Sequence, residues 1–187
     1  MKLQHTFGYD CEGLPSLITD NKLSNFLNKL VALGKQQDPD FYDPLSFMGH
    51  GFEWFVEYFF KFFNGDHTLT YTADYEPTQK YDRGIDGRGL STLDGKPNVI
   101  QCKFKADLNK YLSNVDDISN VAADAVINEG LQYNGKNIIV VTSCKGVHPK
   151  HAMANVHCIS YKEMARRVDN NVIFWDNLRR IVEEQYV

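Results

Sequence analysis

The amino-acid sequence predicts an α/β fold, in which a mixed β-sheet carries helices on both faces. Amphipathic helical segments and short β-branched segments alternate along the chain, as is typical of this fold class. Residues 137–142 (NIIVVT) are nearly all apolar, like a strand that is covered on both faces. Asp94-Gly95 is a turn dipeptide between two strand-like segments, and it predicts a tight hairpin. A buried strand together with a hairpin indicates a mixed sheet.

Residues 1–45 are predicted to form a small N-terminal helical annex with a linker, and residues 46–187 the main domain. Residues 20–33 carry apolar side chains on one helical stripe, and Gly34 is expected to end that helix. Residues 36–44 are polar and contain two prolines, as is typical of a linker.

The main domain is predicted to begin with an aromatic helix at residues 47–63, which Asn64-Gly65 ends. Its phenylalanines recur at helical spacing, so we expect them to face the core and not to form a base-stacking platform. The later elements are expected in this order: strands at 68–72, 84–90 and 98–104, a helix at 114–129, a strand at 137–142, a short helix from Pro149, a strand at 156–159, a helix to about Val168 that opens with the capping box Ser160-Tyr161-Lys162-Glu163, and a final helix to near Gln185.

The composition excludes several classes of protein. With 187 residues, of which 43% are hydrophobic and 24% charged, the chain is long enough for a core and too apolar for a disordered protein. No apolar run reaches the roughly 18–20 residues that span a bilayer. The first residues lack the apolar segment of a secretory signal. We therefore expect a cytoplasmic protein with no membrane segment.

The four cysteines are predicted to be free thiols, most of them in apolar strands. None lies in a CxxC or CxxH pair, so the spacing gives little support for zinc. They are Cys11, Cys102, Cys144 and Cys158.

The charge is unevenly distributed along a chain whose net charge is -4. Residues 1–100 carry 9 basic and 14 acidic side chains, whereas residues 101–167 carry 9 basic and 6 acidic ones. The positive segment favours a phosphate-facing surface, and an uneven solvated surface explains it nearly as well.

Polar side chains in the predicted hairpin converge on one point. If Asp94-Gly95 is a two-residue turn, paired positions sum to 189 and Asp86 lies opposite Lys103. Gln101 is two residues from Lys103, so it shares that face of the sheet. Burying such groups in an apolar strand is costly unless they are paired or bind a ligand. The alternative to a ligand site is a structural salt bridge between Asp86 and Lys103.

The aromatic helix also carries two carboxylates. Glu53 and Glu57 are four residues apart and share a face of the helix. In a helix dominated by phenylalanine, either one is a candidate for the same site.

These motifs, in this order, resemble the PD-(D/E)XK nuclease superfamily. The resemblance is closest to the Mrr-like restriction endonuclease branch, in which Q-x-K replaces E-x-K, and it covers residues 47–168. It implies a restriction-endonuclease-like fold for the main domain. The segments that carry it are Phe52-Glu53 on a helix, Gly84-Ile85-Asp86-Gly87, Val99-Ile100-Gln101-Cys102-Lys103, then Ile139-Val140-Val141-Thr142-Ser143 followed by a helix and the strand-helix unit at 156–168.

Carried over residue by residue, the resemblance implies a magnesium site at which manganese can substitute. Asp86 would be the central metal ligand, with Gln101 and the backbone carbonyl of Cys102 as further ligands. Glu53 would hold the metal or its water shell, and Lys103 would position or activate the attacking water. Because Gln101 is neutral, the site should bind metal more weakly than an E-x-K site.

The function that the resemblance implies is metal-dependent endonucleolytic cleavage of DNA by a homodimer, leaving a 5′-phosphate. Lys105, Lys145 and Lys150 are candidate contacts to the DNA backbone, and scattered surface charge is the alternative. A structure-specific nuclease on the same fold, such as a Holliday junction resolvase, is a close alternative. A catalytically inert DNA-binding module and an interaction protein that uses the annex helix stay open, as does a helicase or methylase partner.

Overall fold

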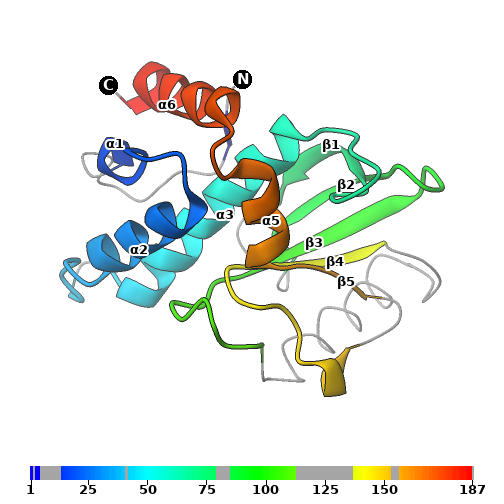
Figure 1. Ribbon diagram of the computed structural model, residues 1–187, viewed down its shortest axis with the longest axis horizontal. Helices are drawn as coiled ribbons and strands as arrows, with labels where there is room; N and C mark the ends of the chain where they lie inside the picture. The colour runs from blue at the N-terminus through cyan, green and yellow to red at the C-terminus, as the bar shows by residue number, and fades with distance from the viewer. Residues whose placement is uncertain are drawn as a thin grey trace.

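The computed structural model is a mixed α/β structure, in which a five-stranded β-sheet is flanked by helices (Figure 1). It describes residues 1, 3–4, 14–40, 42–78, 85–112, 137–152 and 156–186. The predicted fold class is confirmed at this level. The strands lie side by side in chain order as β1 (Thr72–Pro77), β2 (Gly87–Ser91), β3 (Pro97–Lys103), β4 (Ile138–Thr142) and β5 (Val156–Ile159).

The sheet is mixed, as predicted. β1, β2 and β3 pair antiparallel, whereas β3, β4 and β5 pair parallel. Every residue of β4 is buried, which agrees with a strand covered on both faces. A parallel step from β3 to β4 needs a long crossover. The helix predicted for it, at residues 114–129, lies outside the described residues.

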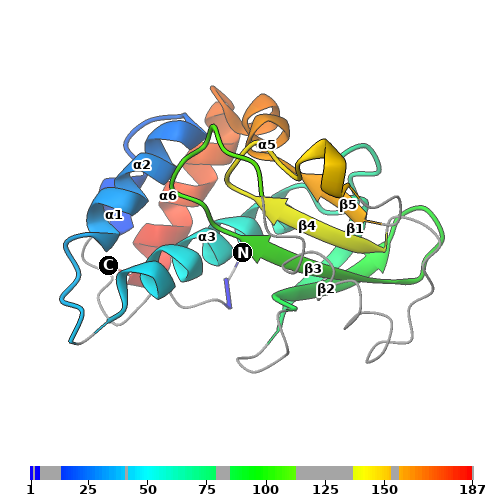
Figure 2. The ribbon, with the colours of Figure 1, turned by 90° about the horizontal axis from the view of Figure 1, so that it is seen from below.

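Helices α1, α2 and α6 gather at one end of the molecule and the sheet occupies the other end, in both views (Figures 1 and 2). Helix α3 runs from the helical end to the sheet, where it packs on β1 and β3. In the described ranges, no helix combines the length and the apolar composition that a membrane crossing requires. The helices are α1 (Leu14–Leu17), α2 (Leu23–Gly34), α3 (Pro44–Phe62), the 3₁₀ helix η2 (Pro149–His151), α5 (Tyr161–Val168) and α6 (Val172–Tyr186).

The aromatic side chains of α3 form the centre of the hydrophobic core. Phe52, Phe55 and Phe59 are fully buried. The Phe55 ring centroid lies 5.0 Å from that of Phe26 in α2 and 5.9 Å from that of Phe174 in α6. The aromatic helix is therefore core and not a base-stacking platform, as predicted. Helix α2 shares this core with α3, and the division into annex and main domain stays a prediction.

Local capping explains where several elements begin. Helix α3 starts at Pro44, earlier than predicted, because the Asp43 carboxylate accepts a hydrogen bond from the Ser46 N–H at 2.7 Å. The predicted capping box at Ser160 and Glu163 is confirmed: the Ser160 N–H donates to Glu163 Oε2 at 2.8 Å, and the Glu163 N–H donates to Ser160 Oγ at 3.4 Å.

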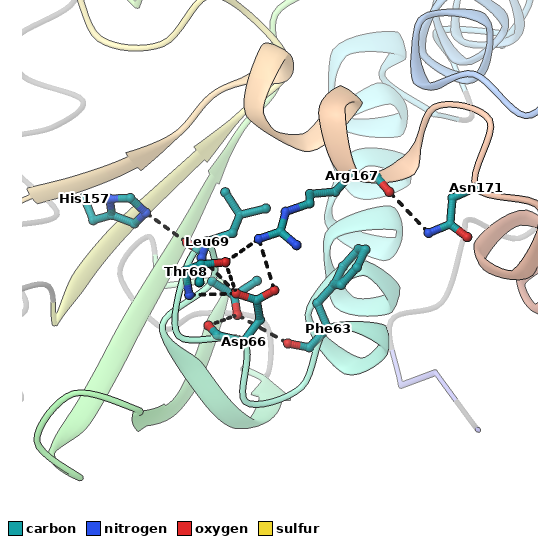
Figure 3. A network of polar contacts seen from close by, with 8 residues as sticks. Phe63, Asp66, Thr68, Leu69, His157, Arg167 and Asn171 are labelled. Carbon is teal, nitrogen blue, oxygen red and sulfur yellow. Dashed lines mark hydrogen bonds and ion pairs between the residues drawn. The ribbon is translucent and has the colours of Figure 1, made fainter.

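The strand predicted at residues 68–72 is wrong. Residues 67–70 form turns, and β1 begins only at Thr72. The Asp66 carboxylate accepts hydrogen bonds from the Thr68 N–H (2.7 Å) and the Leu69 N–H (3.0 Å), which bend the chain away from an extended conformation. Arg167 of α5 pairs with the same carboxylate at 3.3 Å (Figure 3). A side chain from the far end of the chain thus helps to fix this turn.

The β2–β3 hairpin is real, but its predicted two-residue turn is wrong. The Ser91 N–H donates to the Lys96 carbonyl at 2.7 Å, so the loop consists of the four residues between them. Gly95, at φ +70°, donates its N–H to the Ser91 carbonyl at 2.8 Å and closes this loop. Gly87 therefore pairs with Ile100, and paired positions sum to 187 instead of 189.

Candidate active site

Asp86 forms hydrogen bonds with the backbone of Ile100 and Cys102, the residues of β3 that flank Gln101. The Asp86 N–H donates to the Ile100 carbonyl oxygen at 2.8 Å, and the Cys102 N–H donates to Asp86 Oδ2 at 2.6 Å. Asp86 therefore lies beside Gln101. The prediction that it lies opposite Lys103 is wrong, because the longer hairpin loop shifts the register by two residues.

Gln101 carries an unusual buried acceptor. The residue is 5% exposed, and its Oε1 has no hydrogen-bond partner within the described part of the chain. It pairs with Val140, which belongs to a small apolar cluster with Leu112 and Cys144. A polar atom buried without a donor costs about 1–3 kcal/mol. Such an atom needs a hydrogen-bond donor or a bound cation that the described residues do not supply.

Lys103 lies on the same face of the sheet as Gln101, because the two residues are separated by one position in β3. The opposite face of the sheet carries Ile100 and Val141, which pack in the core with α3. Glu53 belongs to α3 and is partly exposed. Glu53 therefore belongs to the helix that packs on one face of β3, whereas Gln101 and Lys103 lie on the opposite face. Asp86 Oδ2 accepts a hydrogen bond from the backbone of the strand between them.

Burial and nearby carboxylates both act on the ionisable side chains around Cys102. Loss of solvation raises the pKa of the Cys102 thiol well above its ordinary value, and the charges of Asp86 and Glu53 raise it further. Lys103 acts on the same thiol in the opposite direction. Loss of solvation also raises the pKa of Tyr75, and the charges of Cys102, Asp86, Glu57 and Glu53 raise it further. Asp86 and Glu53 therefore create a negative potential at one point, which a bound cation would offset.

The two carboxylates of α3 have different surroundings. Glu57 is fully buried, and its Oε1 accepts hydrogen bonds from Lys61 Nζ at 2.6 Å and from the Gln4 N–H at 2.7 Å. These contacts give Glu57 a structural role in joining the N-terminal segment to α3. Glu53 lies one turn earlier, is partly exposed and acts on Cys102, so it remains the candidate from this helix.

Tyr75 of β1 is a part of the site that the sequence reasoning misses. Its side chain is buried, and its hydroxyl donates to the Asp86 carbonyl oxygen at 3.5 Å. A Cβ atom at Gly87 would lie 2.5 Å from that hydroxyl oxygen, so only glycine leaves room for the ring. The glycine after Asp86 was the available signal, since an isolated glycine in a strand marks a close approach.

The three lysines proposed to contact DNA lie in loops that follow the carboxyl ends of β3 and β4. Ser143 joins these loops: its hydroxyl accepts from the Lys105 N–H at 2.6 Å and donates to the Lys105 carbonyl at 2.8 Å. Lys105, Lys145 and Lys150 are all exposed. The structure therefore groups Lys105 and Lys145 near one edge of the sheet, and Lys150 follows on η2.

The donor set fits a hard cation better than a zinc ion. Across the described ranges, no group of three or more His, Cys, Asp or Glu side chains is placed to hold a metal. The candidate ligands are instead oxygen atoms of different kinds: the Asp86 carboxylate, the orphaned Gln101 Oε1 and the Cys102 carbonyl. Magnesium takes oxygen ligands and keeps several waters, so it needs few protein groups.

Cys102, Cys144 and Cys158 are free, as predicted, while Cys11 lies outside the described residues. No protein-family model, no curated protein and no solved structure matches this chain. The function is therefore argued from the chemistry of the site.

Proposed function

We propose that this chain is a magnesium-dependent endodeoxyribonuclease with a restriction-endonuclease-like fold, acting on DNA in the cytoplasm. One observation carries the proposal: Gln101 Oε1 is buried without a donor among the described residues, and the neighbouring Asp86 carboxylate accepts a hydrogen bond from the N–H of Cys102, the next residue of β3. The Asp86 carboxylate and the Gln101 amide oxygen come from neighbouring positions of the hairpin, and together they would supply two oxygen ligands to a cation. The antiparallel β1–β3 unit, followed by the parallel β4 and preceded by α3, agrees with the proposed fold.

Each residue then has a defined role. Asp86, Gln101 Oε1 and the Cys102 carbonyl would hold the cation, and Glu53 would hold its water shell from α3. Bound magnesium would supply a water of lowered pKa and neutralise charge on the phosphate. The Lys103 ammonium would stabilise the negative charge that develops on the phosphate oxygens. Manganese, which also takes oxygen ligands, should support the same reaction.

Tyr75 would act as a positioning residue for this site. Its ring occupies the space beside Gly87, and its hydroxyl contacts the Asp86 carbonyl. Both contacts fix the main chain that carries the Asp86 carboxylate. Burial and the nearby carboxylates raise the pKa of the Tyr75 phenol well above its ordinary value, so the phenol stays a neutral donor.

Cleavage of supercoiled plasmid DNA tests the proposal. The unmodified protein should nick or linearise plasmid with Mg²⁺ or Mn²⁺ and be inactive with EDTA. Asp86→Asn and Lys103→Met keep the size of each side chain and should lower the rate at least about 100-fold. The matched controls are Asp176→Asn in α6 and Lys96→Met in the β2–β3 loop, which change exposed side chains outside the site and should cut at the parent's rate.

Two outcomes would contradict the proposal. If Asp86→Asn and Lys103→Met cut as fast as the parent, the site is assigned wrongly. If the protein binds DNA but cuts neither plasmid nor branched DNA with any of the metals, it is an inert DNA-binding module. Cutting confined to four-way junctions would keep the site and change the substrate to that of a junction resolvase. Sedimentation during the same assay would show whether a homodimer forms.

A further inference from the structure

An exposed aromatic ring lies beside a lysine and two histidines in the loops after β3 and β4. We call Tyr111, Lys145, His148 and His151 the tyrosine surface. Tyr111 is 41% exposed, and Lys145 Nζ lies 5.6 Å from its ring centroid. The His148 ring meets the Tyr111 ring edge-on, with centroids 5.3 Å apart and planes at 76°. The His151 ring lies a further 5.8 Å from that of His148.

Backbone hydrogen bonds join the two loops that carry this surface. The Lys145 N–H donates to the Lys110 carbonyl at 2.9 Å, and the Leu112 N–H donates to the Gly146 carbonyl at 2.9 Å. Leu112 also forms a parallel bridge with Val147 and is fully buried. Tyr111 therefore sits between two fixed neighbours, and its exposed ring is held in place by the fold.

Positive charge is concentrated in these two loops. Residues 103–112 and 142–152 contain five lysines and one aspartate, although the whole chain has a net charge of -4. The aspartate, Asp107, lies 4.0 Å from Lys110 Nζ, so it offsets only one of the lysines directly. A ligand with repeated negative charges and flat apolar groups suits such a surface, because each lysine can meet an anion and the ring can stack.

The tyrosine surface adjoins the proposed active site. The Lys103 carbonyl accepts hydrogen bonds from Thr142 Oγ1 at 2.8 Å and from the Ser143 N–H at 3.4 Å. Lys145 is only two residues beyond Ser143, which limits the separation of their Cα atoms to about 7 Å. A polyanion that passes Lys103 can therefore reach Tyr111 without leaving this edge of the sheet.

We propose that the tyrosine surface binds a single-stranded segment of DNA, with a base stacked on Tyr111 and phosphates on Lys145 and its neighbours. This deepens the proposed function and rests on it for the choice of DNA. Single-stranded DNA is the class that fits, because a base must be unpaired and unstacked to lie on a protein ring. In an intact duplex the bases stack on one another, so no base is available to stack on Tyr111.

Binding of a fluorescein-labelled twelve-nucleotide oligo(dT) to the full chain in EDTA tests this inference. Tyr111→Leu should weaken binding about tenfold, because base–aromatic stacking is lost, whereas Tyr111→Phe should bind within about twofold of the parent. Lys145→Gln should lower the slope of log K against log[salt] by about 0.7, the value for one phosphate contact to a single strand. Lys96→Gln, at the opposite edge of the sheet before β3, should change neither quantity.

The inference is overturned if Tyr111→Leu binds oligo(dT) as tightly as the parent, or if the parent itself does not bind oligo(dT). It is also overturned if Tyr111→Leu weakens binding to a blunt hairpin duplex by the same factor. The measurement needs neither metal nor cleavage, so it is separate from the plasmid assay. If the protein binds oligo(dT) through Tyr111 but never cuts DNA, only the nuclease proposal is contradicted. If the protein cuts DNA with metal but Tyr111→Leu does not change oligo(dT) binding, only this inference is contradicted.

Discussion

Replacing Gln101 with methionine should stabilise the metal-free protein. Gln101 is 5% exposed, and its Oε1 has no donor in the part of the chain that the structure describes. Methionine is unbranched, has a similar length and adapts to irregular space, but it has no oxygen atom that needs a donor. The substitution therefore removes the cost of the buried acceptor and keeps most of the packing in the middle of β3.

The expected gain is about 1 kcal/mol, the lower end of the ~1–3 kcal/mol that a buried unsatisfied polar atom costs. In a chain of this size, that change raises Tm by about 2–4 °C. Magnesium should stabilise the unmodified protein and not the Gln101→Met variant. At about ten times its Kd, it should stabilise the unmodified protein by about 1.4 kcal/mol, or about 3–6 °C, and leave Gln101→Met unmoved.

Thermal unfolding followed by circular dichroism, once with EDTA and once with Mg²⁺, measures both effects. The matched control is Gln36→Met, which changes an exposed residue and should leave Tm within about 1 °C of the parent. A Tm for Gln101→Met several degrees below the parent in EDTA would mean that the amide stabilises the fold. A rise with Mg²⁺ as large as that of the parent would mean that Gln101 is no ligand. Either result refutes the reasoning.

Three further predictions concern stability, and urea unfolding checks each of them. Gly87→Ala should lower the free energy of unfolding by about 2 kcal/mol, because the new Cβ meets the Tyr75 ring. Gly49→Ala should raise it by about 1 kcal/mol, because nothing lies within 4 Å of that Cβ in helix α3. Equal effects of the two substitutions would contradict the close contact between Gly87 and Tyr75. Asp66→Asn should cost about 1 kcal/mol at neutral pH. Burial alone would raise the pKa of Asp66, but hydrogen bonds outweigh it and lower the pKa below 3.8, so the folded state holds fewer protons and the difference should shrink as the pH falls below about 4. A difference that is constant down to pH 2 would refute this. Burial raises the pKa of Cys158 to about 11 from 9.0, so the folded state keeps its proton to higher pH. The parent should therefore lose about 2 kcal/mol more than Cys158→Ala between pH 9 and pH 11, and parallel pH profiles would contradict this.

The sequence predicts those elements whose signals are local. The apolar run of β4 and the capping box at Ser160 each depend on a few adjacent residues, and the structure confirms both. The phenylalanine spacing of α3 likewise identifies a buried helix. In each case, burial or capping follows from side chains within one or two turns, so a single sequence is enough.

Contacts between distant residues account for what the sequence does not predict. Helix α2 begins at Leu23 and not at residue 20, because the Asp169 carboxylate accepts the Leu23 N–H at 2.8 Å from 146 residues away. The chain turns at Asp66 with the help of Arg167. A local sequence pattern cannot identify Asp169 or Arg167 as a partner, because each lies far along the chain from the segment it contacts.

The membership of the candidate site stays a prediction, and the arrangement that the sequence predicts for it is wrong at Asp86. Gln101 and Lys103 share a face, as alternation along a strand requires. The position of Asp86 depended on the length of a hairpin loop, and the dipeptide Asp94-Gly95 suggested two residues where the chain uses four. The roles of Glu53 and Glu57 depended on Gln4, whose backbone lies next to Glu57 only in the folded chain.

The most direct test of the account is to locate the cation itself. Crystals of the protein soaked in Mn²⁺ should show an anomalous scattering peak within about 2.3 Å of both the Asp86 carboxylate and Gln101 Oε1, a typical metal–oxygen distance. The same soak of Gln101→Met should show a weaker peak or none. An ordered crystal with no peak beside Asp86, or with manganese bound only elsewhere on the molecule, would contradict the central claim that β3 and Asp86 form a metal site.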